Sequence, residues 1–226
     1  MIDAGGTISP DNNVFIGKNL IGRYLWETGV RRIDYLLVSH PEDDHIAGLP
    51  FLEEAFPLEK IYSSELHCVR LEREATLFSG NSFVLEGVHH QVFWPMGKST
   101  RNGDLNDRSL VVLLTYGNFK ILFTGDISAA SEKKIMENPE LGNLTVLKVA
   151  HHGSGSSTCR SFLETTSPEA ALISAGRSNP FGHPSPQVLE RLQASGTRIY
   201  TTPELGSLKI ITNGKDWSIT PCGGRP

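Results

Sequence analysis

The 226-residue sequence predicts an α+β fold in which helices cover mixed sheets. Strands alternate with helices in the outer parts of the chain, whereas strands in the middle pair as hairpins. A purely doubly wound sheet would show the alternation throughout. The length and the 38% content of hydrophobic residues suit one domain, over 1–226, with a sizeable core.

The first part of the chain predicts short strands and helices. Apolar residues recur at helical spacing before Gly29, which ends the first helix, and Pro57 stops the second. A continuous apolar run between them predicts a buried strand. The predicted elements are a helix over 18–29, a strand over 33–39, a helix over 46–56, a strand over 60–63 and a helix over 64–80.

The rest of the chain predicts more strands than helices. Gly117 and Asn118 separate two apolar runs and predict a hairpin turn. The predicted helices cover 129–137, 160–165 and 186–195. The predicted strands cover 82–86, 91–94, 110–116, 119–124, 145–150, 170–174, 198–201, 207–211 and 217–220, with a polar loop over 95–107.

Composition excludes some classes of function. The net charge of −4 argues against a broad nucleic-acid cradle, which is normally basic, although a metal ion can still hold a substrate phosphate. Cys68, Cys159 and Cys222 lack metal-binding or disulfide spacing, so we interpret them as incidental thiols. We find neither a signal peptide nor an apolar run near the ~20 residues of a membrane span.

The most informative stretch is 40–45, which reads His-Pro-Glu-Asp-Asp-His and follows the predicted strand 33–39. Three carboxylates in six residues repel one another, and a divalent cation among them would offset that repulsion. The end of a rigid strand can hold ligands as accurately as a metal demands. The alternative is a polar turn with a helix N-cap.

Three further apolar runs also end at His or Asp. They lead to Asp126, to the pair His151-His152 and to His183, so five of the eight histidines lie at predicted strand ends. Sites in α/β folds are built where strands end. For Asp126 the alternative is again a turn or N-cap residue.

These motifs resemble the metallo-β-lactamase superfamily and, within it, the ComEC/Rec2 family of DNA-uptake proteins. The resemblance implies an αβ/βα four-layer sandwich with a metal site at one edge. It covers nearly the whole chain in the expected order. The matching stretches are Ile2 to Gly6, His40 to His45, Asn106 to Val111, Phe123 to Asp126, Leu147 to Ser154 and Asn179 to Pro186.

The chain departs from the superfamily pattern in three places. Glu42 stands where the second His is usual, and Asn106 and Ser109 occupy the region of another metal-binding His. The remaining ligands are richer in oxygen, so we expect one or two divalent ions, either Zn²⁺ or Mn²⁺. The family also has a strand pair before the segment 2–6, so we expect that this pair is missing or that the chain is a fragment of a longer protein.

The resemblance implies the metal ligands. One metal position would use Asp44, His45, Asp126 and one residue of the His pair, for which we select His151. The other would use His40 and again Asp126, with Glu42 either a ligand or a neighbour of one. Asp3 would orient a ligand histidine. A water between two such ions would become a hydroxide nucleophile that attacks phosphorus or an acyl carbon.

Other residues would face the substrate. Asp44, His152 and His183 are the predicted catalytic residues, with His152 hydrogen-bonding a phosphate or protonating the leaving group. His183 is equally well explained as a structural residue that bonds a loop carbonyl. Ser154 begins a Ser- and Gly-rich loop that suits an anion, or that serves as a linker. We predict phosphate contacts or turn roles for Asn106, Ser109 and Asn179.

The resemblance therefore implies a metal-dependent phosphodiesterase or nuclease domain of a bacterial competence protein, acting on single-stranded DNA. The parent protein would lie in the cell membrane through sequence absent from this chain, with this domain soluble. One alternative is a stand-alone, cytoplasmic hydrolase of small phosphoesters or lactones. The other is a degenerate domain that binds without catalysis, which the departures at Glu42 and at 106–109 motivate.

Overall fold

The computed structural model describes residues 1–6, 15–64, 74–97 and 104–222. They divide into two units, the first made of 1–78 and 95–110 and the second of 79–94 and 111–226. Each unit has its own sheet and its own hydrophobic cluster. The single domain over 1–226 stays a prediction.

The first unit contains a parallel sheet in the order β1-β2-β3. Its strands are β1 (Ile33–Val38), β2 (Leu58–Ser63) and β3 (Glu74–Thr76), and its helices are the π-helix η1 (Ile16–Gly22), α2 (Arg23–Glu27), α3 (Asp43–Ile46), α4 (Leu49–Ala55) and the 3₁₀-helix η3 (Asn106–Arg108). Leu36 of β1, Ile61 of β2 and Leu52 of α4 are fully buried in one cluster. This burial explains why β1 reads as a continuous apolar run.

The N-terminal segment is fixed beside β1 and α3. Ile2 pairs with Leu37 as an isolated parallel bridge, and the Ala4 N–H donates to the His45 carbonyl at 2.7 Å. Gly48 allows the segment to approach closely, because a Cβ added there would lie 2.3 Å from the Ala4 carbonyl oxygen. The segment therefore carries Asp3 to the loop that follows β1.

The second unit contains a seven-stranded sheet in the order β10-β9-β8-β7-β6-β5-β4 and a separate hairpin, β11-β12. Strands β4 to β7 pair antiparallel and β7 to β10 pair parallel. The strands are β4 (Ser82–Leu85), β5 (Val88–Trp94), β6 (Val111–Tyr116), β7 (Phe119–Phe123), β8 (Val146–Lys148), β9 (Ala170–Ile173), β10 (Arg198–Thr201), β11 (Ser207–Thr212) and β12 (Trp217–Cys222). The helices are α5 (Ala129–Ile135), η4 (Ala150–Gly153), α6 (Arg160–Thr166), α7 (Pro186–Ala194) and α8 (Thr202–Leu205).

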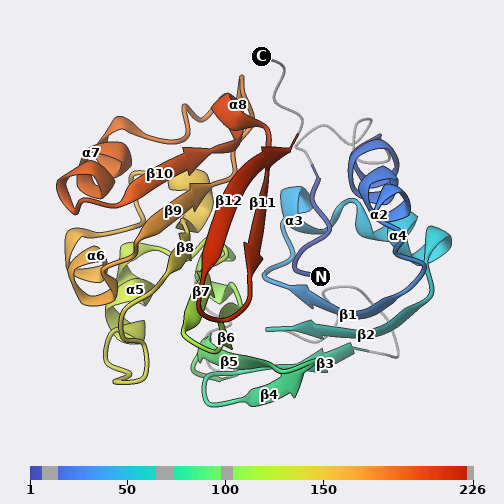
Figure 1. The fold of residues 1–226 in the computed structure, drawn as a ribbon, viewed down its shortest axis with the longest axis horizontal. Coiled ribbons are helices and arrows are strands. Elements are labelled where there is room, and N and C mark those ends of the chain that lie inside the picture. Colours follow the sequence, from blue (N-terminus) through green and yellow to red (C-terminus); the bar gives the residue numbers. More distant parts are fainter. Residues whose placement is uncertain (7–14, 65–73, 98–103, 223–226) are drawn as a thin grey trace. The chain divides into compact units, whose positions relative to one another are not determined.

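Alternate residues of the central strands pack into two different hydrophobic clusters, one on each face of the sheet. Leu122 and Leu147 pack in the large cluster that includes α5, α6 and α7, which lie along one side of the sheet (Figure 1). Their neighbours Ile121 and Val146 pack in a second cluster with Trp217 of the β11-β12 hairpin. The period of two along each strand thus places apolar residues on both faces.

The structure confirms the α+β class and most predicted elements. The prediction of a helix over 64–80 is wrong for 74–76, because β3 pairs with β2, and 65–73 lie outside the described residues, as do Cys68 and 98–103 of the polar loop. The predicted helix over 46–56 corresponds to α4, and a separate short helix, α3, ends at its first residue, Ile46. Within the described ranges, no helix combines the length and the apolarity that crossing a membrane requires.

Candidate metal centre

The loop after β1 places two buried histidines beside three carboxylates. Ser39 and His40 follow the last residue of β1, and Glu42 is the N-cap of α3, which carries Asp44 and His45. The rings of His40 and His45 lie 4.2 Å apart between centroids, and His40 is fully buried. Buried imidazoles need hydrogen-bond partners, so their contacts define their protonation.

Asp3 is the centre of the hydrogen bonds behind these histidines. Its carboxylate accepts from the Ser39 N–H at 2.7 Å and from the Ser39 hydroxyl at 2.9 Å. His45 Nδ1 lies 2.8 Å from Asp3 Oδ2. Because a carboxylate only accepts, Nδ1 of His45 carries a proton, and in the neutral imidazole Nε2 then carries the lone pair.

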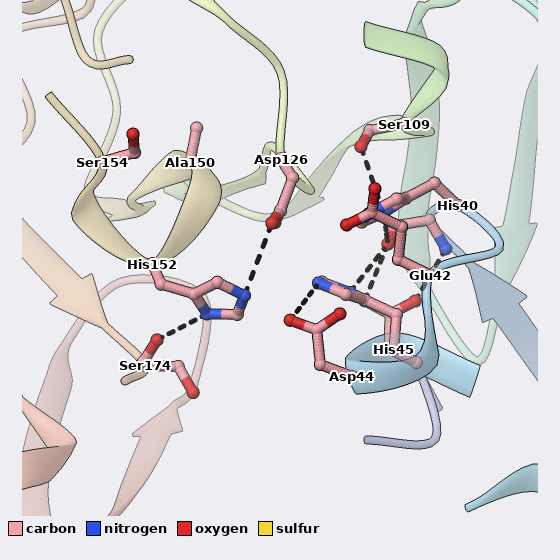
Figure 2. A network of polar contacts seen from close by, with 12 residues as sticks. His40, Glu42, Asp44, His45, Ser109, Asp126, Ala150, His152, Ser154 and Ser174 are labelled. Atoms are coloured by element: carbon pink, nitrogen blue, oxygen red, sulfur yellow. Dashed lines mark hydrogen bonds and ion pairs between the residues drawn. The ribbon is translucent and has the colours of Figure 1, made fainter. Parts of the chain in front are cut away.

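The same network fixes the tautomer of His40. The Ser39 hydroxyl donates its hydrogen bond to Asp3. Its oxygen therefore accepts a hydrogen bond from His40 Nδ1 at 3.1 Å. The Ser109 hydroxyl lies 3.3 Å from the same nitrogen (Figure 2). In the neutral imidazole Nε2 of His40 therefore also carries a lone pair, and this nitrogen lies 3.6 Å from Glu42 Oε2. Nε2 of His45 similarly lies 3.8 Å from Asp44 Oδ2.

In the second unit, Asp126 lies in the turn after β7. Gly125 adopts a φ of 50°, which glycine tolerates, and its carbonyl accepts from the His151 N–H at 3.1 Å. The Thr124 hydroxyl donates to the Lys148 carbonyl at 2.6 Å and so ties this turn to β8. The Asp126 side chain is almost fully buried.

The His151-His152 pair does not continue β8, which ends two residues earlier than the strand predicted over 145–150. The strand ends at Lys148, and both histidines adopt left-handed conformations, with φ of 49° and 53°. His152 Nδ1 lies 2.8 Å from the Ser174 carbonyl oxygen, and its Nε2 lies 3.4 Å from Asp126 Oδ2 (Figure 2). A carbonyl only accepts, so Nδ1 of His152 donates, and in the neutral imidazole Nε2 carries the lone pair. His151 instead lies against His183, with ring centroids 5.8 Å apart.

Three histidines thus share one pattern. In His40, His45 and His152, a hydrogen bond occupies Nδ1, and Nε2 faces a carboxylate oxygen at 3.4 to 3.8 Å. These distances exceed those of ordinary hydrogen bonds. Two acceptor atoms that face each other are stabilised by a cation bound to both. Imidazole Nε2 with its other nitrogen bonded is the usual form of a metal-ligating histidine, so the residues fit a divalent ion.

His183 lies in the loop between β9 and α7. Burial lowers its pKa, and the nearby histidines, His151 and His152, lower that pKa further against an opposing effect of Asp126. Asn179 holds the loop, because its side chain accepts from the His183 N–H at 2.9 Å and donates to the His183 carbonyl at 2.7 Å. The Asn179 amide, which we expected to contact phosphate, is thus engaged within the loop.

The other expected substrate contacts differ in their surroundings. Ser109 is fully buried and contacts His40, whereas Asn106 lies in η3. Ser154 contacts Ser156 in the loop that follows the His pair. Ser39 and Ser174, which hold the imidazoles of His45, His40 and His152, were not predicted from sequence. Only Ser39 had a local signal, since it stands between a buried strand and the first candidate ligand.

Residues 1–177 match the family model of the metallo-beta-lactamase superfamily. The chain belongs to this superfamily. It is 27% identical over 230 residues to "ComE operon protein 3" of Bacillus subtilis, a match that covers 92% of this chain and 29% of that protein. It is 30% identical to "Recombination protein 2" of Haemophilus influenzae, covering 83% and 23%, and 31% identical to "Competence protein ComA" of Neisseria gonorrhoeae, covering 80% and 26%. The chain thus spans less than a third of these relatives.

Solved structures support the fold of the family. The metallo-beta-lactamase fold protein YhfI from Bacillus subtilis matches with a TM-score of 0.56 at 14% identity, covering 88% of this chain and 82% of that chain. A putative metal-dependent hydrolase from Parabacteroides distasonis matches with a TM-score of 0.53 at 15% identity, covering 78% and 79%. At these identities the likeness concerns the fold alone. The recognition of the superfamily and of its competence-protein relatives from sequence is confirmed.

Proposed function

We propose that this superfamily hydrolase is a metal-dependent phosphodiesterase that cleaves single-stranded DNA. The observation that carries the proposal is the shared pattern of His40, His45 and His152, in which Nε2 lone pairs face carboxylates. The names of two relatives, a competence protein and a recombination protein, support the proposal of DNA as the substrate. The net charge of −4 means that metal ions, and not a basic surface, would hold the phosphate.

The proposed ligands come from the loop after β1 and from the turns after β7 and β8. His40, Asp44 and His45 are supplied by the first, and Asp126 and His152 by the others. This set mixes imidazole nitrogen with carboxylate oxygen, which suits both Zn²⁺ and Mn²⁺. In this arrangement His152 binds the metal and His151 contacts the substrate. These roles are the reverse of those expected from sequence.

A divalent ion held by such ligands would supply a water of lowered pKa and would polarise the phosphoryl oxygen. Asp3 and Ser39 keep the imidazoles in the tautomer that presents Nε2. Burial lowers the pKa of His183 and so favours its neutral form, which can hydrogen-bond a phosphate. His151, which packs against His183, lies beside that phosphate in the proposal.

The relatives are more than three times as long as this chain, so their remaining sequence has room for further functions. We propose that the corresponding parent protein lies in the bacterial cell membrane and takes up DNA. The domain would then degrade the strand that is not imported.

The test is cleavage of an end-labelled single-stranded oligonucleotide by the purified domain with Mn²⁺ or Zn²⁺. We expect cleavage by the native protein, loss of cleavage in Asp126→Asn and His45→Ala, and no loss in the control Asp216→Asn, which changes an exposed carboxylate of the β11-β12 turn. The metal content of each variant is measured in parallel. Equal cleavage by native protein and Asp126→Asn would remove the proposal, and hydrolysis restricted to a small chromogenic phosphodiester would replace DNA with small substrates.

A further inference from the structure

Phe181 is an exposed aromatic residue in the loop between β9 and α7. Its side chain is 65% accessible to solvent, and it lies two residues before His183 in the second unit. A phenylalanine this exposed adds little to a hydrophobic core, so packing does not explain it. Phe181 is not among the site residues that we predicted from sequence.

The surroundings of Phe181 hold its ring in place. The ring stacks on His183, with centroids 5.8 Å apart and planes inclined by 21°. His183 is fixed by the Asn179 side chain and contacts His151 edge-on at 5.8 Å. A row of three rings therefore runs from the exposed Phe181 to the His pair, all within the second unit.

The same loop carries a fixed cation. Arg177 is exposed, and its Nε donates to the Pro203 carbonyl at 3.1 Å, which holds the guanidinium at the base of the loop. Sites for single-stranded nucleic acid combine cations along the backbone with aromatic rings on which bases stack. Arg177 and Phe181 supply both parts within one short loop.

We propose that Phe181 is a stacking platform for a nucleobase of the single-stranded substrate, and that Arg177 contacts a phosphate next to it. This inference rests on the proposed nuclease function and names a subsite for it. His183 supports the platform from behind, so the stacked base lies one ring away from the imidazole that faces the phosphate. Because every base has a π-face, the platform is tolerant of sequence.

The test compares two single-stranded oligonucleotides of equal length, one normal and one with abasic sugars in place of several nucleotides. The variants are Phe181→Ala, Phe181→Trp and the control Ile211→Ala, which removes an exposed apolar side chain of β11. For the normal oligonucleotide we expect Phe181→Ala to raise KM by about tenfold with little change in kcat, since base stacking on an aromatic ring is worth about that factor. Phe181→Trp and Ile211→Ala keep the native KM.

The abasic oligonucleotide separates stacking from other roles. Native protein and Phe181→Ala should cleave it with the same KM, because it has no base to stack. An equal loss on both oligonucleotides, or no loss on either, overturns the inference while the nuclease function stands. Cleavage of neither oligonucleotide by native protein instead refutes the proposed function.

A binding measurement supports the kinetics without turnover. With native protein and a phosphorothioate oligonucleotide that resists cleavage, 2-aminopurine should lose fluorescence by stacking, and Phe181→Ala should abolish that quenching. Lower salt should tighten binding in native protein, and less so in Arg177→Ala. Quenching that persists without the Phe181 ring would contradict the platform.

Discussion

His45 Nδ1 lies 2.8 Å from Asp3 Oδ2, so the carboxylate of the N-terminal segment sets the tautomer of a histidine in the loop after β1. The backbone supports this contact, because the Ala4 N–H donates to the His45 carbonyl. The two residues thus hold each other through main chain and side chain. Their geometry leads to the first prediction.

Asp3→Asn should lower the affinity for Zn²⁺ or Mn²⁺ by about 10- to 100-fold, the usual cost of losing a partner behind a ligand histidine. The amide presents a donor as well as an acceptor and so no longer enforces one tautomer of His45. Competition with a chelator of known affinity measures the change. The control Asp34→Asn, on β1 and half-exposed beside Arg32, should bind metal as the native protein does. Equal affinity in Asp3→Asn would show that Asp3 is only structural.

His152→Gln and His151→Gln should have different effects. We expect His152→Gln to reduce the metal bound per chain, because Nε2 of His152 faces Asp126 at 3.4 Å. His151→Gln should keep the metal and lower kcat by about 10²- to 10⁴-fold, the usual contribution of proton transfer or hydrogen bonding at a reacting group. Elemental analysis and steady-state kinetics measure the two quantities, with His89→Gln on β5 as the control. Metal loss in His151→Gln alone would restore the expectation from sequence.

Glu132→Gln tests a carboxyl that organises the loop after the His pair. The side chain is fully buried in α5 and accepts from the backbone N–H groups of Thr158 and Cys159. An amide has one acceptor oxygen where a carboxylate has two, so one N–H loses its partner. We expect a loss of about 1–3 kcal/mol in the free energy of unfolding, measured by urea denaturation. The exposed control Glu137→Gln should change it by less than about 0.5 kcal/mol.

The same variant has a predicted pH dependence. Burial raises the pKa of Glu132 more than its hydrogen bonds and Arg191 lower it. The folded state then binds the proton more tightly than the unfolded chain does. The stability from Glu132 is therefore complete below about pH 4.3, where an unfolded glutamate titrates, and is lost as pH rises through the folded pKa. The difference in unfolding free energy between native protein and Glu132→Gln should shrink as pH rises; a growing difference would contradict the raised pKa.

Gly48→Ala should displace the segment that carries Asp3. The new Cβ would lie 2.3 Å from the Ala4 carbonyl oxygen, a distance at which the backbone must move. We expect a loss of about 1–3 kcal/mol in the free energy of unfolding, with weaker metal binding. Gly176→Ala is the matched control, since its Cβ would meet only ordinary contacts at 3.6 Å. Native metal affinity in Gly48→Ala would show that the segment can shift without moving Asp3.

The strand ends were predictable because their signal is local. An apolar run that breaks off at His40 or Asp126 marks both a strand and its polar end, and the structure places β1 and β7 accordingly. The tautomer of His152 was not predictable, because it depends on the Ser174 carbonyl in another strand's loop. The strand β3 was missed for the same reason, since Ala75 pairs with Tyr62 only in the folded sheet. Local sequence patterns thus indicate which residues form the site, and tertiary contacts decide which nitrogen of each histidine donates.

The left-handed backbone at His151 and His152 bears on any attempt to engineer this protein. Side chains with a Cβ lose about 1–2 kcal/mol in that conformation, and glycine does not. A library selected only for thermal tolerance would therefore enrich glycine at both positions and discard the imidazoles. Engineering of a more thermostable variant should keep both histidines and place stabilising substitutions elsewhere in the chain.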